Sequence, residues 1–315
     1  MPNATGTTIN PHALSVEDLM TRGYFPDRAI PPINSLALAP AMPDILSHVR
    51  PLALDLVNKV KGASIPRSRC VSHSIPKRKH LRRTLSIPNP LAQAILCDEV
   101  ALHWQELSES CAKSPISLSI PKPSVERAIE VSNDIAQLPS YRARQSVGAR
   151  YLLTSDIARY YPSIYTHSIP WALHTKSTAR DDKKNALVGN RLDLWIRETQ
   201  DKQTGGIPIG PDTSFLIGEI IGTAIDLRLQ SELGQLSGAR FIDDYYLYFP
   251  TVSAAERGLA AFHTVSREFE LEINDPKTEI IVCLKCWNRS GKAISAAFQF
   301  ATAANHPAVY PGATR

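Results

Sequence analysis

The sequence predicts an α+β fold, in which helices pack on one face of an antiparallel sheet. Proline accounts for 24 of the 315 residues and is frequent before residue 90, which excludes a bundle of long helices in that half. From residue 151 onward, apolar runs predict elements in the order strand, helix, helix, hairpin, helix, strand. The chain is 43% apolar and 21% charged, as expected of a folded domain.

The first half of the chain contains two segments with helical periodicity. The first runs from about Leu91 to Leu107. The second begins after Ser124, a residue that often caps helices, and extends to about Leu138. Residues 151–157 follow as a buried strand that ends in a carboxylate.

A loop and a long helix come next. Residues 205–211 are rich in glycine and proline and form the loop, after which Asp212 or Thr213 caps a helix that reaches about Leu233. This helix is apolar nearly all round. Gly218 and Gly222 lie four residues apart and leave a smooth strip for a large neighbour.

The remaining elements complete the sheet. Residues 240–249 contain two β-type runs around a pair of acids, which predicts a hairpin with the acids at its tip. Ser253 and Glu256 predict a capping box at the start of a helix. Residues 271–274 and 278–284 are then expected as strands around a turn.

The composition also restricts location and redox chemistry. The sequence has no run of 18 apolar residues and no signal peptide, so we expect a cytoplasmic protein without a membrane partner. Its five cysteines are thinly spread, which argues against a disulfide framework. Cys283 and Cys286 have the spacing of a metal or redox pair, but the apolar flanks favour two ordinary thiols.

Positive charge is concentrated in one segment. The net charge is +5, yet no carboxylate occurs between Asp55 and Asp98. That segment contains nine basic side chains: Lys59, Lys61, Arg67, Arg69, Lys77, Arg78, Lys79, Arg82 and Arg83. It is either a solvated basic face or a surface that contacts phosphate groups.

The acids at the hairpin tip are the first candidates for chemistry. Asp243 and Asp244 repel each other, so the pair favours a hard divalent cation bound through oxygen. Asp156 ends a buried strand that could lie beside the hairpin and would supply a third carboxylate. Three such groups can hold two magnesium ions for an in-line phosphoryl displacement. The alternative for the pair alone is a solvated turn.

Four motifs in order carry a family resemblance. Residues 156–164, 206–211 with Ser214, 241–244 and 274–278 resemble the successive palm motifs of reverse transcriptases. Within that superfamily, three further segments are similar to bacterial reverse transcriptases of abortive infection and other defence systems: residues 22–26, 83–90 and 165–174.

The resemblance implies the fingers and palm of a right-hand polymerase. It divides the chain into a tail at 1–18, fingers with an N-terminal helical region at 19–150, a palm at 151–285 and a short C-terminal segment at 286–315. The last segment has no helical period, so the thumb is expected to be absent or vestigial, and a partner or a second copy of the chain could complete it.

The resemblance also implies roles for individual residues. Asp156 and Asp243, with the Ile157 carbonyl, would bind Mg²⁺ or Mn²⁺, and Asp244 would be a nearby ligand. Tyr161 would lie under the incoming sugar and exclude a 2′-hydroxyl.

Further roles concern the nucleotide and its phosphates. Gly206 and Pro208 would let backbone approach the new base pair, and Lys277 would place a cation or acid near the departing pyrophosphate. Residues 74–90 would form a strand–turn–strand finger with Lys77 and Lys79 near its bend. Arg83 matches the phosphate-binding position of the motif better than Arg82, and strand alternation turns only one of the two inward.

The resemblance therefore implies an RNA-directed DNA polymerase that uses dNTPs with an RNA template, a DNA primer or both, acting in antiphage defence. Three alternatives remain open. The chain could extend a protein primer without a template, it could be a catalytically silent palm that binds nucleic acid or a partner, or it could be an RNA-dependent RNA polymerase. Tyr161 disfavours the last.

Overall fold

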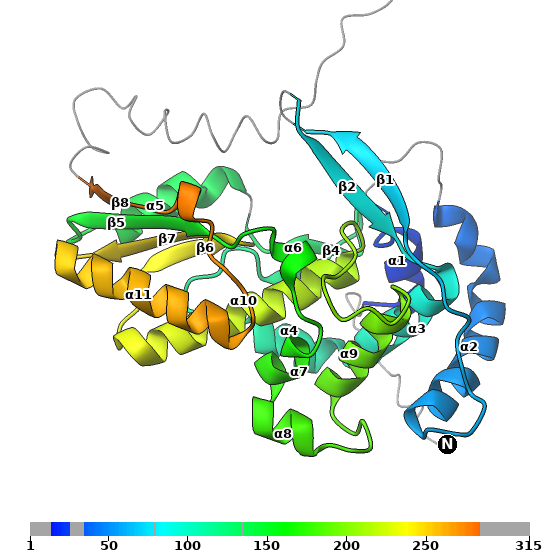
Figure 1. The fold of residues 1–315 in the computed structure, drawn as a ribbon. Coiled ribbons are helices and arrows are strands. Elements are labelled where there is room, and N and C mark those ends of the chain that lie inside the picture. The colour runs from blue at the N-terminus through cyan, green and yellow to red at the C-terminus, as the bar shows by residue number, and fades with distance from the viewer. Residues whose placement is uncertain (1–13, 26–34, 78–79, 134, 284–315) are drawn as a thin grey trace, which may run out of the picture.

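A computed structural model describes residues 14–25, 35–77, 80–133 and 135–283 (Figure 1). Before residue 150 the elements are α1 (Val16–Thr21), η1 (Ser35–Ala41), α2 (Met42–Val57), β1 (Val71–Pro76), β2 (Arg82–Ile87), α3 (Pro90–Leu102), α4 (Trp104–Cys111), β3 (Pro121–Pro123), β4 (Ile129–Val131), η2 (Ile135–Gln137) and α5 (Leu138–Gln145).

The elements after residue 150 carry the main sheet. They are β5 (Tyr151–Asp156), α6 (Tyr160–Ser163), α7 (Ser168–Leu173), α8 (Lys176–Asp181), α9 (Val188–Glu198), α10 (Asp212–Leu233), β6 (Gly238–Phe241), β7 (Asp244–Phe249), α11 (Val252–Glu268), η3 (Asp275–Lys277) and β8 (Glu279–Val282). No helix in these described ranges is long and apolar enough to cross a membrane.

The main sheet has four antiparallel strands in the order β6-β7-β5-β8. Helix α11 runs along one face (Figure 1), where Phe262 is fully buried and its ring centroid lies 4.5 Å from that of Tyr245 in β7. On β6, Ala239 packs in a small cluster with Leu138 of α5 and with Leu118. The predicted α+β class is confirmed, but the sheet carries helical contacts beyond the single layer that the sequence predicts.

Helix α10 spans 22 residues and is buried along most of its length. Its two glycines lie where large side chains cross it. A Cβ atom at Gly218 would come within 3.1 Å of the Tyr161 ring, and one at Gly222 within 2.7 Å of the Arg240 guanidinium. The predicted smooth strip is therefore confirmed, and its neighbours are Tyr160, Tyr161 and Arg240.

The hairpin β1–β2 projects away from the helical body in Figure 1. Its strands pair antiparallel from Val71 opposite Ile87 to Pro76 opposite Arg82, which confirms the two paired strands but leaves their role as a finger a prediction. The hairpin is tied to the second half of the chain because the Ser86 amide donates to the Ile209 carbonyl at 2.9 Å. This bond joins the basic segment to the loop before α10.

The N-terminal helix α1 begins at Val16, inside the segment predicted as a tail. Ser15 caps it through a capping box with Asp18, and Leu19 and Met20 are fully buried. Tyr24, just after this helix, donates a hydrogen bond from its hydroxyl to the Pro88 carbonyl.

The helix predicted from Ser124 to Leu138 is wrong. Residues 121–123 and 129–131 pair as the short strands β3 and β4, and the Ser124 amide donates back to the Ala128 carbonyl. The turn is held from a distance, since the Ile129 amide donates to the Asp212 carboxylate at 3.0 Å. Val125, which the helical pattern would bury, is 82% exposed.

Several element ends also differ from prediction. The first helix breaks into α3 and α4 at His103. Thr251, rather than Ser253, caps α11 by accepting from the Ala254 amide.

The N-terminus of α10 and residues 271–274 also differ from prediction. Helix α10 has no side-chain cap, because the Asp212 carboxylate faces Arg127 and Ile129 instead. Residues 271–274 form only a bridge, between Ile273 and Ile157, instead of a strand. Cys283 is half-buried, whereas Cys286 lies outside the described residues.

Candidate active site

The sheet brings two of the three predicted carboxylates together. Asp156 is the last residue of β5 and is paired in register with Asp244, the first residue of β7. The Asp156 side chain is buried, and its backbone carbonyl accepts from the Asn274 amide at 2.8 Å. Neighbouring strands lie about 5 Å apart, so the register places both acids at one edge of the sheet.

Asp243 occupies the tip of the hairpin between β6 and β7. Phe241 pairs with Asp244, which leaves Ile242 and Asp243 as a two-residue loop. Ile242 has a φ of 59°, a left-handed conformation that costs a residue with a Cβ atom about 1–2 kcal/mol. The predicted hairpin with acids at its tip is confirmed.

The electrostatics of the tip disfavour ionisation. Burial, followed by the charges of Asp244 and Asp156, raises the pKa of Asp243 from 3.8 to about 7. Partial burial, followed by the charge of Asp156, also raises the pKa of Asp244. The Asp244 side chain nevertheless keeps contact with solvent. Both shifts indicate that this edge of the sheet favours a positive charge.

Lys277 supplies one positive charge. It ends η3, and its ammonium group donates to the Asp156 Oδ2 atom. Burial alone would lower the pKa of Lys277, but this hydrogen bond and the nearby carboxylates outweigh burial and raise it. The side chain is 63% exposed, so the ammonium group remains accessible from solvent.

The donor chemistry of this edge suits a hard divalent cation. Asp156 Oδ1 is buried and has no hydrogen-bond partner, and Asp243 and Asp244 provide further carboxylate oxygens. Within the described ranges, no cluster of three or more His, Cys, Asp and Glu side chains has the arrangement of a metal site. The ligand set Asp156, Ile157, Asp243 and Asp244 therefore remains a prediction.

Tyr161 lies beside these acids. Its ring packs near Gly218 and near the ring of Tyr160, whose centroid is 5.5 Å away. Burial raises the pKa of the Tyr161 phenol, the Asp243 charge raises it further, and Arg83 lowers it. Tyr161 is therefore within electrostatic range of both Asp243 and Arg83.

The loop before α10 is joined to the Tyr161 segment through backbone hydrogen bonds. The Ile207 amide donates to the Tyr161 carbonyl at 2.9 Å, and the Gly206 amide donates to the Ile164 carbonyl at 2.8 Å. Gly206 has a φ of 79°, and a Cβ atom there would lie 2.9 Å from the Pro162 carbonyl oxygen. Pro208 is buried in the same loop.

The hairpin β1–β2 separates the two candidate arginines. Arg82 donates from Nε to the Ser74 hydroxyl and from Nη2 to the Ser74 carbonyl, both at 2.7 Å, so it is held within its own hairpin. Arg83 is exposed, and its charge partly offsets the rise in the pKa of the Tyr161 phenol that burial causes. The Lys77 charge opposes the rise in the pKa of Asp244 without reversing it. Lys79 lies outside the described residues.

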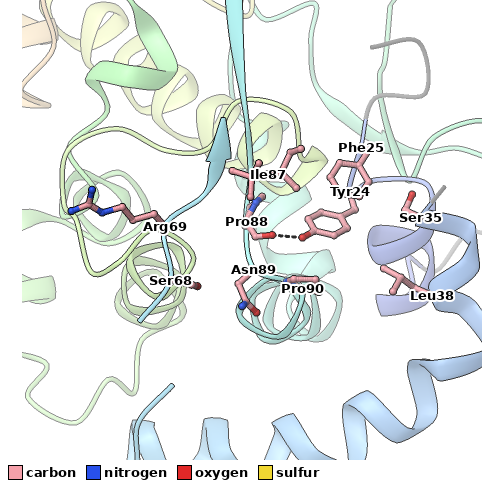
Figure 2. Close-up of a pocket in the computed structure, with 11 residues that line it drawn as sticks. Tyr24, Phe25, Ser35, Leu38, Ser68, Arg69, Ile87, Pro88, Asn89 and Pro90 are labelled. Atoms are coloured by element: carbon pink, nitrogen blue, oxygen red, sulfur yellow. Dashed lines mark hydrogen bonds between the residues drawn. The ribbon is translucent and has the colours of Figure 1, made fainter. Parts of the chain in front are cut away.

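A cavity of about 360 Å³ lies at the base of this hairpin (Figure 2). Tyr24 and Phe25 stack on one side of it, with ring centroids 4.1 Å apart. Pro88 and Asn89 line the other side. Residues 24–25 and 87–90 therefore lie together at this cavity, joined by the hydrogen bond from the Tyr24 hydroxyl to the Pro88 carbonyl.

Sequence reasoning missed a buried ionic cluster behind the hairpin. Arg240 of β6 contacts Glu219 and Asp226 of α10, and all three side chains are almost completely buried. A signal was present, because Glu219 and Asp226 are seven residues apart in an otherwise apolar helix and so share one face.

Comparisons with known proteins are sparse. No family model matches the sequence, and no curated protein matches it. Among solved structures, a C-terminally truncated apo telomerase from Candida tropicalis is similar over 71% of this chain and 52% of its own, with 11% identity and a TM-score of 0.49.

Two related structures give weaker scores. A telomerase from Candida albicans in complex with a TWJ fragment of telomeric RNA has 13% identity, a TM-score of 0.44 and coverage of 69% of this chain and 43% of that chain. The apo telomerase from Candida tropicalis has 10% identity, a TM-score of 0.45 and coverage of 76% and 49%. The chain spans about half the length of these structures.

Proposed function

We propose that this protein is a metal-dependent nucleotidyltransferase, an RNA-directed DNA polymerase. The observation that carries the proposal is the register of β5 and β7, which pairs Asp156 with Asp244 directly beside the turn that contains Asp243. Acids held on neighbouring strands of a buried sheet, with an electrostatic preference for added positive charge, are the arrangement that two-metal phosphoryl transfer uses.

Asp156 and Asp243, with the Ile157 carbonyl, would hold Mg²⁺ or Mn²⁺, and Asp244 would assist from the next strand position. When bound, the cations would lower the pKa of a 3′-hydroxyl and neutralise charge on the phosphates. Support for the ligand set comes from the unpartnered, buried Oδ1 atom of Asp156 and from the raised pKa values of Asp243 and Asp244.

Cationic side chains would bind the triphosphate on two sides. Arg83 is free of its own hairpin, unlike Arg82, and its guanidinium can bind phosphate in a bidentate manner. Lys77, and Lys79 near the same bend, would add diffuse positive charge for a nucleic-acid backbone. Lys277 would hold a proton close to the departing pyrophosphate.

Tyr161 would select the sugar. Its ring packs against Gly218 of α10, and the Tyr160 ring lies next to it at the same glycine. A ring fixed in this way leaves no space for a 2′-hydroxyl, which favours dNTPs. Gly206 and Pro208 would allow the loop backbone to approach the new base pair, since the loop is bonded to the Tyr161 carbonyl through Ile207.

The biological part of the proposal rests on the resemblance of residues 22–26, 83–90 and 165–174 to defence reverse transcriptases. We propose a cytoplasmic role in abortive infection, with an RNA template and a DNA primer as partners. The domain division proposed above would place fingers before residue 150 and the palm after it.

The test is incorporation of labelled dNTPs or NTPs with Mg²⁺ or Mn²⁺, on an RNA template with a DNA primer or without nucleic acid. The wild type and an Asp243→Ala, Asp244→Ala variant are compared. The control is Asp181→Ala, whose side chain is 70% exposed on α8.

Incorporation by the wild type and the control, but not by the double variant, is the expected result. Label on the primer would support reverse transcription, whereas label on the protein would indicate protein priming. A folded wild-type chain that incorporates nothing under any of these conditions would refute the proposal and favour a silent palm that binds nucleic acid or a partner.

A further inference from the structure

A buried ionic cluster lies directly behind the hairpin that contains Asp243. Arg240 donates from Nη1 and Nη2 to the two carboxylate oxygens of Glu219, at 2.9 and 2.7 Å, and from Nε to Asp226 at 2.8 Å. The exposed fractions of these three residues are 0%, 2% and 0%. Because Nε, Nη1 and Nη2 all donate to carboxylates, the Arg240 guanidinium is held in one orientation.

The cluster reaches the backbone of the hairpin turn at two points. Arg240 Nη1 also donates to the Ile242 carbonyl at 3.0 Å. The Ile242 amide donates to the Ser119 hydroxyl at 2.9 Å, and that hydroxyl donates to Glu219 Oε2 at 2.9 Å. Both polar groups of the Ile242 backbone are therefore bonded to one network.

Ile242 needs such restraint because its conformation is unfavourable. Its φ is positive, whereas that of Asp243 is not, which is the sign pattern of a type II′ turn. Glycine is the usual residue at the first position of that turn, and a β-branched residue there is an outlier. Local preference alone would not keep this turn in place.

Helix α10 leaves space for the Arg240 guanidinium at Gly222. A Cβ atom at Gly222 would lie 2.7 Å from Arg240 Nη1 and 2.8 Å from its Cζ atom, so glycine leaves the space that the guanidinium fills. Buried ion networks add little net stability compared with apolar packing of the same volume. The distinctive consequence of this one is geometrical, because it sets the backbone of the residue before Asp243.

We infer that Glu219, Arg240 and Ser119 are positioning residues, which hold Ile242 in a left-handed conformation and thereby set the place of Asp243 at the candidate metal site. The cluster acts through the turn backbone and does not touch substrate. Its effects on catalysis and on cation binding rest on the proposed function, whereas its effect on the turn does not.

The first test is hydrogen exchange of the backbone amides in the β6–β7 hairpin, measured in the full chain. Ser119→Ala removes one hydroxyl and should raise the exchange rate of the Ile242 amide about tenfold, the ratio that corresponds to one lost hydrogen bond. Leu96→Val is the control, since Leu96 is fully buried in α3, away from the hairpin. It should lower stability without changing exchange at Ile242.

The second test is Mn²⁺ binding, measured by titration in the absence of nucleotide. Ser119→Ala should weaken Mn²⁺ binding about tenfold, and Arg240→Lys, which keeps the charge but loses the fork, should weaken it at least as much. Adding Ile242→Gly to Ser119→Ala should restore affinity, because glycine adopts a positive φ without restraint. A purely structural role for Ser119 predicts no such rescue.

The outcomes separate this inference from the proposed function. Faster exchange at Ile242 and weaker Mn²⁺ binding in Ser119→Ala support positioning even if the wild type incorporates no nucleotide. If the wild type is active, kcat should fall about tenfold in Ser119→Ala while the nucleotide KM stays unchanged. Unchanged exchange and unchanged Mn²⁺ affinity in both Ser119→Ala and Arg240→Lys would overturn the inference.

Discussion

Replacing Gly206 with alanine should destabilise the loop that supports the candidate site, whereas the same change at the adjacent Gly205 should not. Gly206 is buried and has a φ of 79°, and its new Cβ atom would lie 2.9 Å from the Pro162 carbonyl oxygen. Gly205 is exposed, and a Cβ atom there would meet no atom within 4 Å. The pair is a matched comparison, because both changes add one methyl group to the same loop.

The magnitude follows from two separate costs. A left-handed conformation costs alanine about 1–2 kcal/mol, and forcing a methyl group against a packed backbone oxygen costs about 1–3 kcal/mol. Gly206→Ala should therefore reduce the free energy of unfolding by about 2–5 kcal/mol, a fall in Tm of roughly 3–8 °C for a chain of this length. Gly205→Ala should leave stability within about 0.5 kcal/mol of the wild type or raise it slightly.

The assay is urea unfolding of the two variants and the wild type, followed by nucleotide incorporation at a temperature where all three are folded. Pro162 follows Tyr161, and the Ile207 amide is bonded to the Tyr161 carbonyl. A shift of this loop should therefore lower incorporation at least about tenfold. Equal stability of the two alanine variants would refute the reasoning, since it would mean that the positive φ and the close contact impose no cost.

Three further predictions concern the site itself. Tyr161→Ala should admit ribonucleotides, and incorporation assays with matched dNTPs and NTPs that show unchanged sugar discrimination would contradict the role of its ring. Arg83→Ala should raise the nucleotide KM about tenfold more than Arg82→Ala, because Arg82 is held by Ser74; steady-state kinetics that give the reverse order would assign Arg83 to the template. Asp243→Asn should stabilise the protein in EDTA at pH 8 by roughly 1–3 kcal/mol. The folded-state pKa of Asp243 is raised to about 7, so its ionisation costs stability as pH rises from about 4 to about 7 and the loss persists above. Urea unfolding at pH 4 and pH 8 should show the gain only at pH 8, and equal stability of Asp243→Asn and wild type at pH 8 would contradict the shift.

Local patterns in the sequence were sufficient for the elements that carry the acids. The strand ending at Asp156 and the hairpin with Asp243 and Asp244 at its tip both follow from apolar runs that stop at polar residues. The helix from Asp212 to Leu233 follows from its length and its glycine-rich approach. These patterns depend only on neighbouring residues in the chain, so the sequence is sufficient to predict the elements.

The sequence failed where a distant residue decides the local structure. The helix predicted from Ser124 to Leu138 is replaced by a turn and strand β4, where the Ile129 amide donates to Asp212, far along the chain. The same contact removes Asp212 from the helix cap that its residue type predicts. Tertiary hydrogen bonds of this kind outweigh propensities worth a few tenths of a kcal/mol.

The sequence by itself therefore determined the α+β class, the order of the elements around the sheet and the positions of the candidate acids in the chain. Only the tertiary structure decided that Arg82 is held by Ser74 while Arg83 is free, and that Glu219 and Arg240 meet behind the turn before Asp243. Periodicity reports which face of an element is buried, but it does not report which buried charge meets which partner. That choice depends on how the strands and α10 pack together.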